Sequence, residues 1–146
     1  MPIARVLLIG LAFCCFRPAL ADTVNRVAEN NIPVTMIEVV RTQRDTIVRL
    51  RAEVAMENVC WYNAGANAPY LLAGGRRYRL TGGEGIAMCP QRRGYTAHQI
   101  MVLHFELLDP AAREVSLVEG QGGENQMIDP KSSSERFWNF LHVYLK

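Results

Sequence analysis

The stretch Ile47–Val54 reads IVRLRAEV, and hydrophobic side chains alternate along it with charged ones. Its apolar face is made of Val48, Leu50, Ala52 and Val54. Arginine and glutamate side chains occupy the other face. A period of two residues is typical of a β-strand with one buried face and one solvated face. This stretch therefore predicts a strand at the surface of a β-structure.

The same period recurs towards the C-terminus. Gln99–Leu107 places alternate apolar side chains on one face, and Glu114–Glu119 repeats the pattern over a shorter length. Phe137–Leu145 is apolar on both faces, which predicts a strand covered on both sides. Weaker candidates are the short runs Val34–Arg41, Val59–Tyr62, Tyr70–Ala73, Arg77–Thr81 and Gly85–Cys89.

Glycine and proline separate these runs at short intervals. Gly74-Gly75 lies between Tyr70–Ala73 and Arg76–Leu80, where it suits a two-residue hairpin turn. Further turns are predicted at Gly82-Gly83, at Asp109-Pro110 and at the glycines numbered 120, 122 and 123. Closely spaced strands with such turns predict an all-β fold, an antiparallel β-sandwich of about 7–9 strands.

Residues Met1–Ala21 have the three parts of a secretory signal peptide. Arg5 precedes an apolar run of about 11 residues, and a membrane-spanning helix needs roughly 20. Ala19 and Ala21 give the small-residue spacing that signal peptidase requires. A short membrane anchor, the alternative, fits this length less well. We expect a periplasmic or secreted mature chain with no transmembrane segment.

The sequence contains no internal repeat and no linker between domains, and we divide it into three segments. Residues 1–21 are the predicted signal peptide, residues 22–45 an N-terminal arm with the first strand, and residues 46–146 the β-sandwich domain. Within the arm, Asp22–Asn31 predicts either a short helix or an untethered segment. Ser132–Glu135 has the spacing of a helix capping box, and a plain polar loop is an equal alternative.

Removing the signal peptide changes the charge balance. The whole chain has 16 basic and 14 acidic residues. The signal peptide contains Arg5 and Arg17 and no acidic residue, so the mature chain has 14 residues of each sign. A nucleic-acid-binding domain normally has a basic surplus, so we expect no nucleic-acid partner.

Two cysteines, Cys60 and Cys89, remain in the mature chain after Cys14 and Cys15 are removed. A pair of cysteines in an exported chain predicts one disulfide. A two-cysteine metal or redox site is the alternative, but the sequence has no C-x-x-C motif.

Segments 70–86 and 103–108, then Leu117–Gly120 with an aromatic final strand, resemble one family of exported domains. These are immunoglobulin-like β-sandwich domains of unknown function in bacterial envelope proteins, including segments that precede thioredoxin-like domains in Bacteroidetes. The resemblance covers about Thr46 to Leu145 and rests on the hairpin motif Y-L-x-d-x-x-G-x-x-Y-x-L. It implies a fold and a compartment, and no catalytic residues. The arginine-rich, lysine-poor composition indicates a Gram-negative source.

Candidate chemistry is sparse. His98 and His104 are too far apart along one strand to share a metal, and the possible copper ligands Met88, Met101 and Met127 fit a core better. The carboxylates are scattered singly, and Glu119 is expected to accept backbone hydrogen bonds at a strand end. No nucleophile motif is present. We expect no catalysis, no metal and no cofactor.

A cluster of arginines is the most distinctive surface feature. Arg76, Arg77, Arg79, Arg92 and Arg93 are predicted at hairpin ends, where guanidinium groups bind anions through paired hydrogen bonds. Charged strand edges that prevent unwanted pairing are the alternative. The aromatic residues Trp61, Tyr62 and Tyr70 are expected either at a binding edge or packed around the disulfide.

These features predict a binding or interaction module that recognises another protein of the cell envelope. An inhibitor or immunity protein directed against a cell-wall enzyme is the first alternative. An envelope enzyme or metal carrier is the second, and the lack of a catalytic constellation makes it the weaker one.

Overall fold

The computed structural model of the chain describes residues 20–27, 33–120 and 138–146. These residues form ten β-strands and no helix, which confirms the predicted all-β class. Within them, no helix is long and apolar enough to cross a membrane. Residues 1–19 of the predicted signal peptide, the turn glycines 122 and 123, Met127 and the segment Ser132–Glu135 lie outside this description.

The strands have the following bounds. They are β1 (Leu20–Val27), β2 (Val34–Arg41), β3 (Asp45–Ala52), β4 (Met56–Val59), β5 (Tyr70–Ala73), β6 (Arg76–Glu84), β7 (Arg93–Tyr95), β8 (Ile100–Glu106), β9 (Glu114–Val118) and β10 (Phe140–Tyr144).

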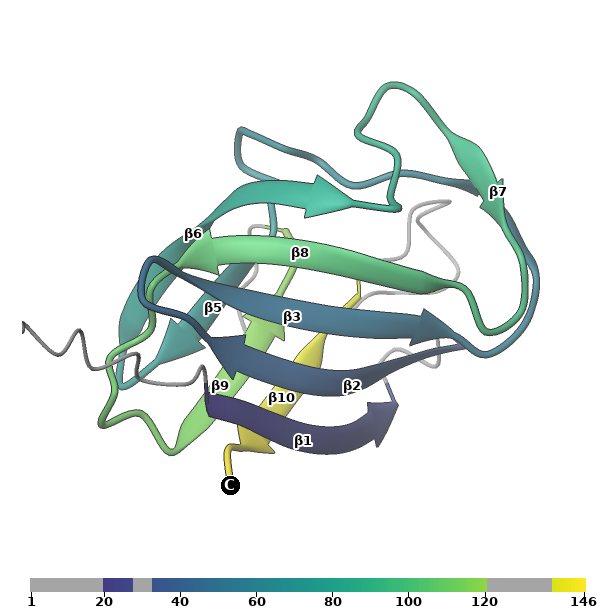
Figure 1. Cartoon of the computed structure of the whole chain (residues 1–146). Helices are drawn as coiled ribbons and strands as arrows, with labels where there is room; N and C mark the ends of the chain where they lie inside the picture. The colour runs from purple at the N-terminus through teal and green to yellow at the C-terminus, as the bar shows by residue number, and fades with distance from the viewer. Residues whose placement is uncertain (1–19, 28–32, 121–137) are drawn as a thin grey trace, which may run out of the picture.

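Eight strands form one antiparallel sheet in the order β1-β2-β3-β8-β6-β5-β9-β10, and β4 pairs with β7 in a separate small sheet. In Figure 1, β1, β2, β3, β8 and β6 form the near layer, and β5, β9 and β10 cross behind it. The two ends of the order, β1 and β10, also contact each other. The sheet is therefore barrel-like.

Strand β6 belongs to both layers. Its first half pairs with β5 from Arg76 to Arg79, and its second half pairs with β8 from Leu80 to Glu84. The turn predicted at Gly82-Gly83 is wrong, because both glycines continue β6. A Cβ on Gly83 would lie 2.8 Å from the Met88 side chain, so glycine permits this close passage. Because the layers share a strand, an immunoglobulin-like sandwich of two separate sheets stays a prediction.

The hydrophobic core lies between the two layers. It contains side chains from both, among them Met36, Val39, Val48, Leu50, Leu71, Met101, Leu103, Phe105, Val115, Leu117 and Phe140. The predicted alternation is thus confirmed within β3 and β8. It fails just beyond the strand ends, where Val54 and Leu107 are exposed to 49% and 41%.

Several predictions about individual strands are wrong. Residues 20–27 are neither a helix nor an untethered arm, because they pair with β2 as strand β1. Strand β10 is not buried on both faces: His142 and Tyr144 are exposed, Tyr144 to 69%. Gly85–Cys89 forms no strand, only the isolated bridge between Met88 and Trp61. Strand β7 was not predicted from the sequence.

Candidate binding surface

The predicted disulfide between Cys60 and Cys89 is confirmed. Backbone hydrogen bonds reinforce it on both sides of Trp61. The Trp61 N–H donates to Ala87 O over 2.9 Å, and the Cys89 N–H donates to Trp61 O over 2.8 Å. The bridge therefore ties the chain after β4 to the segment that leads into β7.

Two of the three aromatic residues that were candidates for a binding edge are buried. Trp61 is 1% exposed, and its ring packs edge-to-face against Trp138 with 5.0 Å between centroids. Tyr70 is also buried, whereas Tyr62 is half-buried. The Trp61 ring therefore lies in the core rather than at an exposed edge.

The predicted arginine cluster is divided between the two ends of the molecule. Arg76, Arg77 and Arg79 lie where β6 begins, next to the β5–β6 turn. Arg92 and Arg93 lie at β7, and Figure 1 shows β7 on the right and the β5–β6 turn on the left. The five residues are therefore not one anion-binding patch.

Arg79 is neutralised within the chain. Its Nε and Nη2 donate to Glu106 Oε1 over 2.9 and 2.7 Å, and its backbone N–H donates to Oε2 over 3.0 Å. The backbone donor first, and the guanidinium second, lower the pKa of the Glu106 carboxyl below its ordinary value. The Arg79 side chain is therefore paired with a carboxylate of the neighbouring strand β8.

Arg76 and Arg77 have aromatic partners instead. The Arg76 guanidinium lies 4.7 Å from the centroid of the Tyr78 ring, and that of Arg77 lies 4.4 Å from the Tyr70 ring. Both arginines are exposed, and neither has an ion pair within residues 33–120 and 138–146. These contacts are cation–π interactions, which orient a guanidinium without neutralising it.

At the other end, the arginines beside β7 also contact their own neighbours. Arg93 lies over the Tyr95 ring at 5.0 Å, and Arg92 Nη1 donates to Asn58 O over 3.2 Å. The Tyr95 hydroxyl accepts a hydrogen bond from Ala87 N–H over 2.7 Å. Burial raises the pKa of this hydroxyl.

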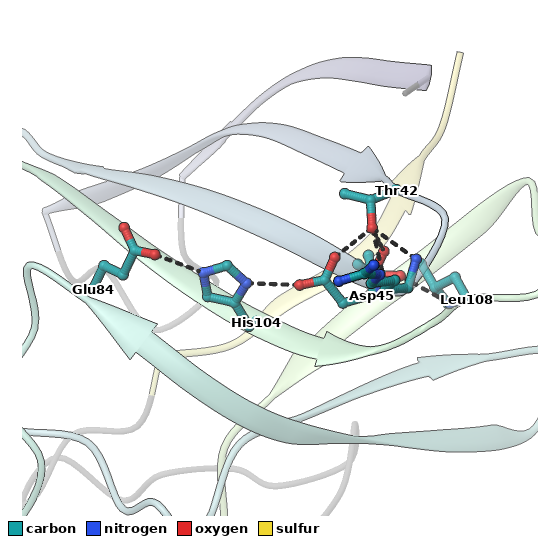
Figure 2. A network of polar contacts seen from close by, with 7 residues as sticks. Thr42, Asp45, Glu84, His104 and Leu108 are labelled. Carbon is teal, nitrogen blue, oxygen red and sulfur yellow. Dashed lines mark hydrogen bonds and ion pairs between the residues drawn. The ribbon is translucent and has the colours of Figure 1, made fainter. Parts of the chain in front are cut away.

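A polar network crosses the outer face of the near layer and was missed from the sequence (Figure 2). His104 on β8 lies between two carboxylates, with Nδ1 2.8 Å from Asp45 Oδ2 and Nε2 3.2 Å from Glu84 Oε1. Thr42 bonds to the other carboxylate oxygen of Asp45. Hydrogen bonds from Thr42 and then from His104 lower the pKa of Asp45.

This network links three strands and includes the β2–β3 turn. The Thr42 hydroxyl accepts the N–H groups of Arg44 and Asp45 over 3.0 Å each, so it closes the β2–β3 turn rather than facing His104. Within residues 33–120 and 138–146, no three His, Cys, Asp or Glu side chains are grouped as metal ligands. Alternation places His104 and Glu106 outward, but the sequence does not reveal which strands lie beside them.

Glu119 has the structural role expected from the sequence. It is 4% exposed, and its Oε2 accepts the Trp138 N–H over 2.9 Å. The Asn139 side chain accepts the Glu119 N–H over 2.9 Å in return. This carboxylate therefore joins the end of β9 to the start of the final strand.

Comparison with known proteins adds no family or relative. No family model, curated protein or solved structure matches the chain. The fold and the contacts described above are therefore the basis for any functional proposal.

Proposed function

We propose that the chain is an exported protein-binding module without catalytic activity, which recognises another protein of the cell envelope. The observation that supports this proposal is the state of Arg76 and Arg77 at the β5–β6 turn. Both guanidinium groups are exposed and lie over tyrosine rings, and neither has an ion pair with a described carboxylate. After the hydrogen bonds from Arg79, the charge of Arg76 also lowers the pKa of Glu106. An exposed cation without an ion pair is suited to a carboxylate of another molecule.

The contrast with the other charges on the barrel strengthens this argument. Arg49 pairs with Glu38, Arg51 pairs with Glu53 over 3.0 Å, and Arg79 pairs with Glu106. These pairs neutralise three of the arginines on or beside the outer face of the near layer. The partner is therefore proposed to bind at the turn rather than on that face.

We also propose that the chain is exported and that its fold is related to immunoglobulin-like sandwiches. The spacing of Ala19 and Ala21 supports a cleaved signal, and the Cys60–Cys89 disulfide supports a periplasmic or secreted location, because disulfides persist in oxidising compartments. The immunoglobulin-like resemblance is part of the same proposal and is supported by the hairpin at Tyr70–Leu80.

Affinity capture from envelope extract tests this function. The full chain would be expressed with a C-terminal tag, alongside the double variant Arg76→Glu/Arg77→Glu. The matched control is Arg44→Glu/Arg113→Glu, which makes the same change of charge at exposed positions elsewhere. We expect one protein that is retained by the wild type and the control, binds in purified form, and is lost with the turn variant. If no protein is retained by the wild type, a binding function is wrong.

A further inference from the structure

We infer that the partner presents an acidic segment that crosses the tip of the β5–β6 hairpin, with one carboxylate bound to Arg76 and another to Arg77. This inference rests on the proposed binding function and names the chemistry of the partner. It follows from the shape of the tip, the faces on which the two arginines lie, and the groups that hold them.

The two residues at the tip of the hairpin, Gly74 and Gly75, have no side chains. Gly74 and Gly75 have φ values of 56° and 79°, in the left-handed region that favours glycine. A Cβ added to either glycine would have no atom within 4 Å. The backbone of another chain can therefore approach the two glycines closely.

The two arginines lie on opposite faces of the hairpin. Successive side chains of a strand alternate, so Arg76 shares the face of Tyr78, and Arg77 shares the face of Tyr70. One small anion such as phosphate is poorly placed to bind both. Two carboxylates on one segment can reach both, one on each side of the tip.

Buried tyrosines hold both guanidinium groups. Tyr78 and Tyr70 are buried, and the Tyr78 hydroxyl accepts the Asp109 N–H over 3.3 Å, which fixes that ring. Each guanidinium lies over its ring and stays exposed, so its N–H donors remain accessible to a carboxylate. Each arginine can therefore offer paired donors to a carboxylate with little further loss of side-chain freedom.

A labelled peptide of alternating aspartate and glutamate provides a direct probe. Its binding to the full chain would be measured by fluorescence anisotropy, with an asparagine–glutamine peptide of equal length as the uncharged control. The variants are Arg76→Gln, Arg77→Gln, their double, and Arg44→Gln/Arg113→Gln as the control for lost charge. Thermal unfolding of each variant confirms that the fold is kept.

We expect each single turn variant to weaken binding about tenfold, because each removes charge-assisted hydrogen bonds. The control variant should bind as the wild type does, and millimolar phosphate should compete weakly. Equal losses in the control variant, strong competition by phosphate, or no binding of the acidic peptide would overturn the inference. An envelope partner that is still retained by the Arg76→Gln/Arg77→Gln variant would overturn it while leaving the binding function intact.

Discussion

Asp45 Oδ2 lies 2.8 Å from Nδ1 of His104, across the boundary between β3 and β8. The same carboxylate bonds to Thr42, so one side chain connects the β2–β3 turn to the neighbouring strand. Both ring nitrogens of His104 face ionisable carboxylates, and an ionised carboxylate only accepts hydrogen bonds. Both contacts are therefore hydrogen bonds only when the imidazole carries both protons.

Asp45 should stabilise the fold in a pH-dependent way. Its pKa is lower in the folded chain than the ordinary value of 3.8, so its contribution is present above the unfolded pKa and is lost as the pH falls through the folded pKa. We expect Asp45→Asn to cost about 1–2 kcal/mol at pH 7. The difference from the wild type should shrink between pH 4 and the acid limit, as measured by urea unfolding at a series of about six pH values.

Asp109→Asn is a suitable control for this prediction. Its Oδ1 accepts the Ala111 N–H over 2.8 Å, and asparagine keeps that acceptor. A pH dependence of Asp45→Asn equal to that of the wild type would contradict the stabilising role of the ionised carboxylate.

The disulfide should account for a large part of the stability. It closes a loop with a sequence separation of 29 residues, for which the chain-entropy model gives about 3–4 kcal/mol. We expect reducing agent to lower the melting temperature of the wild type, as followed by circular dichroism. The variant Cys60→Ser/Cys89→Ser should melt at the lower temperature with or without reducing agent, and a wild type unaffected by complete reduction would contradict the prediction.

Glu119 allows a test of a buried acceptor. Glu119→Leu would leave the Trp138 N–H without its partner, and we expect a cost of about 1–3 kcal/mol in the free energy of unfolding. Glu119→Gln keeps a side-chain oxygen at the same length and should cost less. Urea unfolding of both variants measures the difference, and equal losses would show that the hydrogen bond to Trp138 is not the cause.

Gly85 and Gly82 form a matched pair at the end of β6. Gly85 has a φ of 67°, and a Cβ there would lie 2.9 Å from Ile100 O, whereas a Cβ on Gly82 would have no atom within 4 Å. We expect Gly85→Ala to destabilise the fold by about 1–2 kcal/mol. Gly82→Ala should change it by less than about 0.5 kcal/mol. Thermal unfolding measures both, and similar values for the two would contradict this reading of the backbone.

The sequence predicts the strands better than their arrangement. Alternation identifies β3 and β8, and glycine turn chemistry identifies the β5–β6 hairpin, because both signals are local. The passage of β6 from one layer to the other takes place between Arg79 and Leu80, where its pairing changes from β5 to β8, and sequence periodicity does not contain this change of partner. Strand β7 has only three residues, too few to show a period.

The candidate site shows the same limit. Composition draws attention to the arginines, but only the structure separates Arg79, which is paired with Glu106, from Arg76 and Arg77, which lie over tyrosine rings. Trp61 has the sequence features of a binding residue and lies in the core. His104 gains its carboxylate partners from β3 and β6, which are distant in sequence, so no local motif marks the network.

Strand β6 also determines how the barrel would come apart. On that side the wall is continuous, since one strand is hydrogen-bonded to β5 along its first half and to β8 along its second. On the opposite side, β1 and β10 are the two ends of the strand order. We therefore expect the barrel to open first between β1 and β10, while the hydrogen bonds of β6 to β5 and β8 keep the opposite wall intact. Amide hydrogens beside the β1–β10 contact should exchange with solvent before those of β3 and β8.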